Sequence, residues 1–285
     1  MSTGAWGQRL KRSLAISLVG FITALALQPL PSVALSIGDL LRVLPSAIQI
    51  IQLSNISDRD EVTLGARINQ QISREVRISR DPNANRLVQR IGQLLSTSLE
   101  RPQIPYTFQV VDDPDINAFA TMGGFVYINT GTIAAADNVA QLASVVAHEI
   151  GHIEGRHSLE QMRQQAIAQG IASVAGVADN RLVQLGTAIA LRLPNSREAE
   201  FDADRRGLNL ITNAGFAARA MPDFMQKLAR GDRGNVPTMF STHPNPNDRI
   251  ASLNQQIAER NLVGGDGLND QDYQRIWRSR FGRRG

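Results

Sequence analysis

The sequence has no cysteine, and only 5% of its 285 residues are aromatic. Without cysteine, the chain cannot build a disulfide scaffold, a thiol nucleophile, a cysteine-ligated zinc or iron–sulfur centre, or a cysteine-linked lipid anchor. The low hydrophobicity and high charge typical of disorder are also absent, because 42% of the residues are hydrophobic and 20% are charged. The chain is long and apolar enough for a buried core in one large or two small domains.

Charge of either sign is nearly balanced, with a formal net charge of +4. The basic residues that create the excess stand near the two ends of the chain: Arg9, Lys11 and Arg12, then Arg275, Arg278, Arg280, Arg283 and Arg284. The body between them is slightly acidic, which argues against a nucleic-acid partner. We expect residues 263–285 to form a basic, solvated tail, with peripheral contact to an anionic membrane or to a partner as the alternative.

The first 34 residues have the order of a secretory signal peptide. Basic residues precede an apolar run over residues 14–27, and Ser32 and Ala34 are small residues at the spacing that signal peptidase reads. Cleavage is predicted after Ala34, with Ser36 as a second site. The run is shorter than the ~20 residues of a spanning helix, and an uncleaved membrane anchor is the alternative. We expect export to the periplasm or cell envelope of a bacterium, with residues 35–56 as an apolar N-terminal arm.

Hydrophobic periodicity predicts two helices followed by strands. Ser57 is a candidate N-cap for a helix from about Asp60 to Ser79. A second helix over residues 84–99 would place four apolar residues on one face: Leu87, Ile91, Leu94 and Leu95. Residues 106–111 and 125–129 alternate in character, which predicts two strands with turns between them. The remainder is typical of helix, so the predicted fold class is α+β: a mostly helical domain over residues 57–262 with a small β-sheet.

Two later apolar segments, residues 166–178 and 182–193, are too short to span a membrane. We expect them to be buried helices on either side of a loop at Asp179 and Asn180. A lid that faces a membrane is the alternative.

The strongest chemical signal is a His-Glu-x-x-His motif at residues 148–152. Asp137 or Asn138 can cap a helix over this motif, and two histidines four residues apart on a helix share one face. The nitrogens of His148 and His152 can then hold one Zn²⁺, while Glu149 lies beside that face and can activate a zinc-bound water. The alternative is a buried helix whose histidines are only hydrogen-bonded.

A catalytic zinc needs three protein ligands and an open position. The candidate third ligand lies in residues 196–204, which follow a proline and read as the start of another helix. Glu200 and Asp204 would lie one turn apart on this helix. We assign Glu200 to the metal and Asp204 to the second N–H of a ligand histidine, whose tautomer it would fix. A solvated, acidic helix start is the alternative.

With these blocks the chain resembles the HtpX-like zinc metallopeptidases related to the CAAX prenyl endopeptidase, in particular the soluble, exported bacterial members of the BepA and LoiP type. The resemblance spans about residues 57–260 and rests on residues 60–65, 106–120, 123–131, 148–152 and 196–204, together with Thr242-His243-Pro244 and Asp248-Arg249-Ile250. It implies a zincin-type gluzincin fold with one Zn²⁺ per chain, held by His148, His152 and Glu200, and Glu149 as the base.

The resemblance also implies roles for residues that spacing alone does not place. His243 would lie near the metal, where it could approach the open coordination position or stabilise an oxyanion. Asp204 and Arg249 would support the same region. His157 matches no ligand position and is expected to be a polar residue at a helix end.

The predicted function is a zinc metalloendopeptidase that acts on unfolded or misassembled cell-envelope proteins. An extended substrate would pair with an exposed edge of the strand at residues 125–129, where glycines permit close backbone approach. The candidate substrate-binding residues are Asn117, Gly123, Gly124, Phe125 and Tyr127. One alternative is a zinc-dependent periplasmic chaperone or assembly factor with latent proteolysis. Another is an envelope protein in which the motif is fortuitous.

Overall fold

The computed structural model describes residues 56–168, 180–230, 237–269 and 271–281. The predicted signal peptide and nearly all of the predicted apolar arm lie outside these residues, as do most of the apolar segment 166–178 and Asp179. Within the described residues, no helix combines the length and the hydrophobicity that crossing a bilayer requires.

A three-stranded sheet lies at the centre of the fold. It consists of β1 (Thr107–Val111), β2 (Ala118–Thr121) and β3 (Phe125–Asn129), in the order β1-β3-β2. The central strand β3 pairs parallel with β1 and antiparallel with β2. The first and last strands confirm the sequence-based prediction, but β2 was missed. All four residues of β2 are buried, so its sequence lacks the alternation that marks a half-exposed strand.

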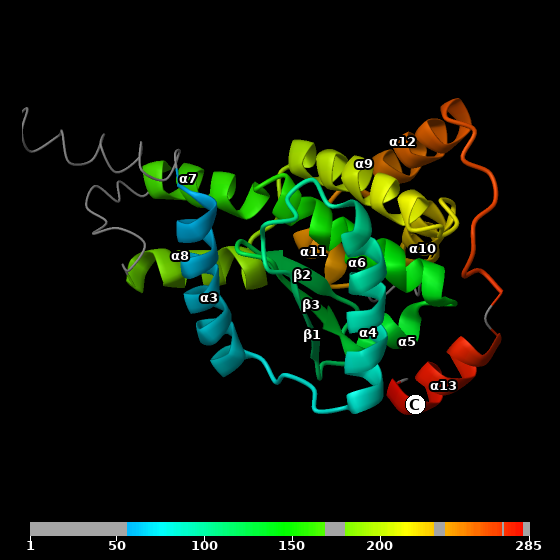
Figure 1. The fold of residues 1–285 in the computed structure, drawn as a ribbon, viewed down its shortest axis with the longest axis horizontal. Helices are drawn as coiled ribbons and strands as arrows, with labels where there is room; N and C mark the ends of the chain where they lie inside the picture. Colours follow the sequence, from blue (N-terminus) through cyan, green and yellow to red (C-terminus); the bar gives the residue numbers. More distant parts are fainter. Residues whose placement is uncertain (1–55, 169–179, 231–236, 270, 282–285) are drawn as a thin grey trace, which may run out of the picture. The chain divides into compact units, whose positions relative to one another are not determined.

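The two faces of the sheet belong to two hydrophobic cores, because successive side chains of a strand point to opposite faces. Val126 and Ile128 join a core with helices α4 (Pro82–Leu95), α6 (Val139–Glu154) and α10 (Ala220–Ala229). Tyr127 joins a second core with α3 (Asp58–Glu75), α7 (His157–Ala168) and α8 (Asn180–Arg192). In Figure 1, α3 and α8 accordingly lie on one side of the strands and α4 and α6 on the other.

The remaining helices complete the first core and its rim. They are α5 (Thr130–Ala135), α9 (Arg197–Asn213), α11 (Met239–Thr242), α12 (Pro246–Glu259) and α13 (Gln271–Phe281), with a short 3₁₀ turn η1 (Ser96–Ser98) after α4. Helix α9 packs along α6, and α10 packs on α12. The prediction of a buried helix over residues 182–193 is confirmed by α8, whose Leu182 and Ile189 are buried.

Two predicted helix boundaries were wrong. Ser57 does cap α3, but the helix begins at Asp58 and ends at Glu75. It stops short of Ser79 because the backbone N–H of Ser79 donates to Val110 beside the sheet. Helix α4 ends at Leu95, and Leu94 is 45% exposed rather than on the buried face.

The C-terminal segment differs from the solvated tail that its basic residues suggest. Residues 271–281 form α13, in which Tyr273 and Trp277 are 3% and 7% exposed and belong to the first core. The Tyr273 hydroxyl also donates to the carbonyl of Ile133 in α5. The arginines of α13 thus stand on a helix whose aromatic residues pack into the first core.

A buried ion cluster joins α3 to the end of α6. Glu61 is fully buried, and its carboxylate lies 2.7 Å from both the Arg101 and the Arg156 guanidinium groups. Arg101 also donates to the carbonyl of Ile153 in α6, and Arg156 donates to Ile56. These bonds fix the end of α6 against α3.

We expect Glu61→Gln to lower the free energy of unfolding by about 3 kcal/mol, because it removes the buried charge that Arg101 and Arg156 share and leaves them only the more exposed Asp58. Glu75→Gln is the matched control on the same helix. Glu75 pairs with Arg192 and accepts from Gln71 at the surface, so this substitution should cost at most about 1 kcal/mol. Denaturant unfolding measures both; equal losses would show that the cluster does not stabilise the fold.

Candidate metal centre

Helix α6 carries the central motif through the core. Asn138 rather than Asp137 is its N-cap, and the Asn138 side chain accepts from the N–H of Gln141. Gly151 lets the neighbouring helix approach closely, because a Cβ at this position would lie 2.6 Å from the carbonyl oxygen of Ala203 in α9. The close packing of α6 and α9 brings the acidic start of α9 over the histidines of α6.

Four buried side chains point their donor atoms at one another: His148, His152, Glu200 and His243. His148 Nε2 lies 3.0 Å from His152 Nε2 and 3.2 Å from His243 Nδ1. The Glu200 carboxylate lies 3.4 Å from His148 Nε2 and 3.3 Å from His152 Nε2. Ligands of a tetrahedral zinc at ~2.0–2.1 Å from the metal are themselves about 3.3 Å apart, so the spacing of these donors suits a metal ion.

The charge around the four donors also fits a cation. Glu149, Glu200 and Asp204 are 1% exposed or less, and the one arginine among them is Arg249. In the state that binds a metal, with the three carboxylates ionised and the histidines neutral, two negative charges are in excess. Burying such an excess without a counter-charge is very costly, and a divalent cation at the donor atoms would remove it.

Asp204 and Arg249 hold His148 from outside the donor set. Asp204 Oδ1 lies 2.9 Å from His148 Nδ1. Arg249 donates to both Asp204 oxygens at 2.7 Å, and its third nitrogen lies 2.5 Å from Glu200. Burial and Arg249 lower the pKa of His148, but hydrogen bonds that the Asp204 and Glu200 carboxylates accept from its ring outweigh them and raise it to about 9. Carboxylates that stabilise a cationic ring would also stabilise a metal cation bound at its Nε2.

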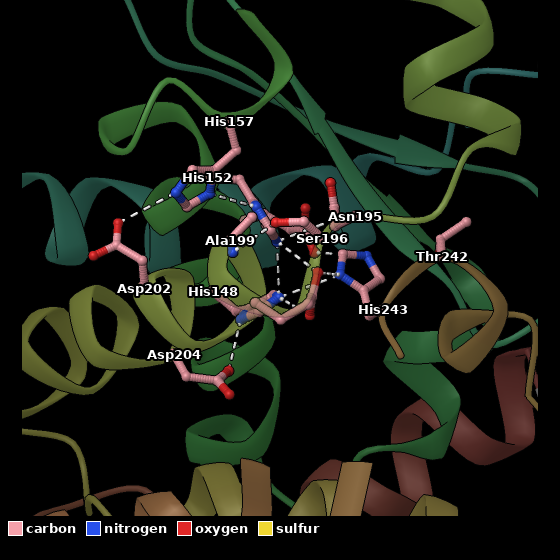
Figure 2. A network of polar contacts seen from close by, with 12 residues as sticks. His148, His152, His157, Asn195, Ser196, Ala199, Asp202, Asp204, Thr242 and His243 are labelled. Carbon is pink, nitrogen blue, oxygen red and sulfur yellow. Dashed lines mark hydrogen bonds and ion pairs between the residues drawn. The ribbon is translucent and has the colours of Figure 1, made fainter. Parts of the chain in front are cut away.

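His157 is the first residue of α7 and is not one of the four donors, as expected for a polar residue at a helix end. It also makes contacts that the sequence did not indicate: its Nδ1 lies 2.9 Å from Nδ1 of His152, and its Nε2 lies 3.2 Å from Asp202. Figure 2 shows these side chains in a row, with His157 between His152 and Asp202. Burial lowers the pKa of His152 to about 3 and also lowers that of His157, which favours the neutral form of both rings. The one sequence signal for this arrangement was a histidine five positions after the motif.

Glu149 lies next to the donor atoms without sharing in them. Both of its carboxylate oxygens are buried and lack a hydrogen-bond partner among the described residues, although His243 Nε2 is 3.6 Å from one of them. Burial raises the pKa of Glu149 above the ordinary value of a carboxyl group. A buried, unbonded carboxylate of this kind is suited to accept a proton.

His243 comes closer to the other donors than a purely supporting residue would. Its Nδ1 lies 3.0 Å from Glu200, and its Nε2 lies 3.3 Å from the carbonyl of Ala118 in β2. Sequence reasoning did not identify Asn195, whose Nδ2 lies 3.5 Å from His152 Nε2 (Figure 2). No periodicity or motif marked Asn195, which stands in the loop before α9.

The prediction that a substrate pairs with the strand at residues 125–129 is wrong, because the sheet topology leaves that strand no free edge. Because β3 is the central strand and is paired on both sides, Phe125 and Tyr127 offer no free edge. Tyr127 is fully buried and donates its hydroxyl proton to Asn69.

The two glycines before β3 also do not contact the donor atoms. They turn the chain at positive φ angles of 79° and 97°, with Gly123 packed on α3 and Gly124 on Pro105. Asn117, in contrast, lies just before β2, and its side chain accepts from Thr242 next to His243. Within the described part of the chain, β2 is paired with β3 alone, so it is the strand with an edge near the donor atoms.

Two hollows border the centre. A cavity of about 30 Å³ adjoins Glu149 and His148 and is walled by apolar side chains of α10 and α11: Met221, Phe224, Met225, Met239 and Phe240. A polar groove of about 650 Å³ lies on the side of His157, with Asn195 and Asp202 in its wall.

A helical pair of histidines, a carboxylate from a second helix and an unbonded glutamate beside them define the class of metallopeptidases. The model of peptidase family M48 matches residues 82–257 of the chain. The chain therefore belongs to peptidase family M48.

Among its relatives, the "Putative beta-barrel assembly-enhancing protease" of Vibrio cholerae is 31% identical over 72% of this chain and 46% of the relative. The "Beta-barrel assembly-enhancing protease" of Escherichia coli is 27% identical over 86% of this chain and 52% of the relative. The "Mitochondrial metalloendopeptidase OMA1" of Arabidopsis thaliana is 34% identical over 53% and 32%. The chain thus spans about half the length of the bacterial relatives.

Metal binding should stabilise the folded state. At a free zinc concentration 100 times the Kd, we expect the free energy of unfolding to rise by about 2.7 kcal/mol, seen as a higher Tm that a chelator reverses. Glu200→Gln should abolish most of this zinc-dependent rise. The control Glu198→Gln, an exposed residue on the same helix, should keep it. A rise of equal size in both variants would exclude Glu200 as a ligand.

Proposed function

We propose that the chain is a zinc-dependent metalloendopeptidase that hydrolyses peptide bonds in unfolded or misassembled proteins of the cell envelope. One Zn²⁺ would be held by His148, His152 and Glu200. The observation that carries the proposal is the meeting of these buried donors beside a glutamate whose oxygens have no hydrogen-bond partner among the described residues. Membership of a metallopeptidase family supports the same activity.

Glu149 has the position of a general base, and its raised pKa suits that role. A zinc ion held at the donor atoms would supply Lewis-acid chemistry, which polarises a peptide carbonyl and makes water more acidic. Glu149 takes the proton from the attacking water and passes it to the leaving amine. Burial raises the pKa of Glu149 toward neutral pH. A group whose pKa is near the working pH can both accept and release a proton at a useful rate.

His243 and Arg249 would tune this chemistry. In the present arrangement His243 stands at the fourth position around the donors, which a catalytic zinc needs open. Turnover then requires the His243 ring to turn away from Glu200, and in that position an N–H of the ring can be donated to a carbonyl oxygen. Arg249 acts through Asp204 and Glu200, whose orientation it fixes.

Substrate would lie along β2 rather than β3. An extended peptide can add its backbone to the edge of β2, close to Asn117, and place its scissile bond near His243. The cavity beside Glu149 is walled by apolar side chains, but at about 30 Å³ it has room for no more than a small apolar group. Recognition of main chain favours unfolded or misassembled proteins over one folded partner.

The place of action is proposed from two observations. The basic, apolar and small residues of positions 1–34 have the order of an export signal. The names of the bacterial relatives also connect them with β-barrel assembly. We infer that this chain acts in the periplasm or cell envelope of a bacterium, on substrates that reach that compartment unfolded.

A second candidate is a zinc-dependent assembly factor or chaperone whose proteolysis is latent. The nearness of His243 to the other three donors favours it, because four protein donors leave a metal no position for substrate. The two functions differ in whether Glu149 is needed.

We expect Glu149→Gln to lower the rate of casein or unfolded outer-membrane-protein digestion by about 10²–10⁴-fold while zinc still binds, since Glu149 moves a proton and holds no metal. Glu154→Gln on the same helix is the control and should keep turnover, because Glu154 is not one of the four donors and its carboxylate accepts from the backbone N–H of Glu100. Chelator should abolish digestion by the parent. Digestion that survives Glu149→Gln would reject the proposed base, and chaperone activity that survives it would favour the second candidate.

A further inference from the structure

The two histidines of α6 are held in different ways. His148 Nδ1 meets a carboxylate directly, at 2.9 Å from Asp204. His152 Nδ1 meets a second imidazole, His157, and only that ring reaches a carboxylate, Asp202 (Figure 2). We propose that His157 and Asp202 form a hydrogen-bond relay that orients the His152 ring and fixes its tautomer for metal binding. This inference rests on the metal centre of the proposed function.

The positions of the atoms allow one arrangement of protons. His152 Nε2 faces the donor set, 3.0 Å from His148 Nε2 and 3.3 Å from Glu200, so it must offer a lone pair to bind a cation. Its proton then resides on Nδ1 and is donated to His157 Nδ1, which accepts. His157 in turn carries its proton on Nε2 and donates it to the Asp202 carboxylate. Every polar atom in the row has one defined role.

Asp202 is held as the anionic end of the row. Arg206 Nε donates to Asp202 Oδ2 at 2.6 Å, and Arg205 contacts the other oxygen. Arg206 also pairs with Glu100 near the end of α4, which limits its movement. With both of its oxygens facing arginines, the Asp202 carboxylate is placed as an acceptor for the Nε2–H of His157.

Gly155 leaves the space in which the relay lies. It ends α6 with φ −74°, a conformation that any residue can adopt, so the backbone does not require glycine there. A Cβ at this position would lie 2.3 Å from His157 Nε2 and 2.9 Å from Asp202 Oδ2. A side chain at Gly155 would therefore displace the His157 ring, the Asp202 carboxylate or both. Steric clearance at the helix end is a second observation that points to the same contact.

His157 is thus a positioning residue that acts through His152. Partners of this kind fix the ring of a ligand histidine and raise its basicity, and their loss typically weakens metal binding by about 10–100-fold. A residue that served only to pack α7 against α6 would instead change the stability of the metal-free protein and leave its zinc affinity unaltered.

The test measures zinc affinity by competition with a chromophoric chelator, in the full chain. We expect His157→Leu to bind zinc about 10–100-fold more weakly than the parent. His157→Asn should recover much of the loss, because its carboxamide can place an acceptor near the position of Nδ1. Gly155→Ala, which keeps both relay residues but displaces them, should also weaken binding. Gln164→Leu, a change in the same groove outside the relay, should bind zinc as the parent does.

A second readout reports the tautomer itself. In the zinc-loaded parent, ¹⁵N NMR of the His152 ring should show the proton on Nδ1. Zinc binding by His157→Leu as tight as that of the parent, or a His152 ring protonated on Nε2, would overturn the relay.

If His157→Leu fails to fold, Gly155→Ala and Asp202→Asn decide the question by the same affinity measurement, and parent-like affinity in both would overturn the relay. A parent protein that takes up no zinc would instead refute the metal centre, and the relay with it.

Discussion

The close contact between α6 and α9 is the constraint on which the site depends. At Gly151 the two helices approach until backbone meets backbone, and a single added carbon would lie 2.6 Å from the Ala203 carbonyl oxygen. Because the helices are so close, the imidazoles of α6 and the carboxylates of α9 can meet at one point. The interior packing that holds this contact is tight, so the donors are organised before any ligand arrives.

The sequence indicated the residues that meet at the centre better than it indicated the architecture around them. His148, His152, Glu200 and Asp204 could be singled out because candidate metal ligands at helical spacing leave a local pattern, whereas His243 was indicated only by the family resemblance. Strand β2 could not be found in this way, since a strand buried on both faces carries no alternation. The early end of α3 was also invisible, because it is set by a bond from Ser79 to the distant Val110. The packing of α13 on the core was not predicted, because its arginines suggested a solvated tail and only Tyr273 and Trp277 are buried.

The errors at the substrate side share one physical cause. Glycines followed by alternating residues suggested an exposed edge, but an edge is a property of strand order, and strand order is decided by pairing between segments far apart in the chain. The glycines before β3 are required by positive φ angles in a tight turn. The polar residues that line the centre from loops, such as Asn195, follow no period, so only coordinates bring them into view.

One consequence follows from the way α9 supplies its acids. Glu200, Asp202 and Asp204 occupy alternate positions of a single helix, yet each serves a different partner: the shared donor point, His157 and His148. Successive residues of a helix are turned by about 100°, so three such contacts together define its rotation about its own axis as well as its height. A slip of α9 by one position would misplace all three at once. The donor residues of the centre can therefore meet only when α9 packs in its correct register against the rest of the domain.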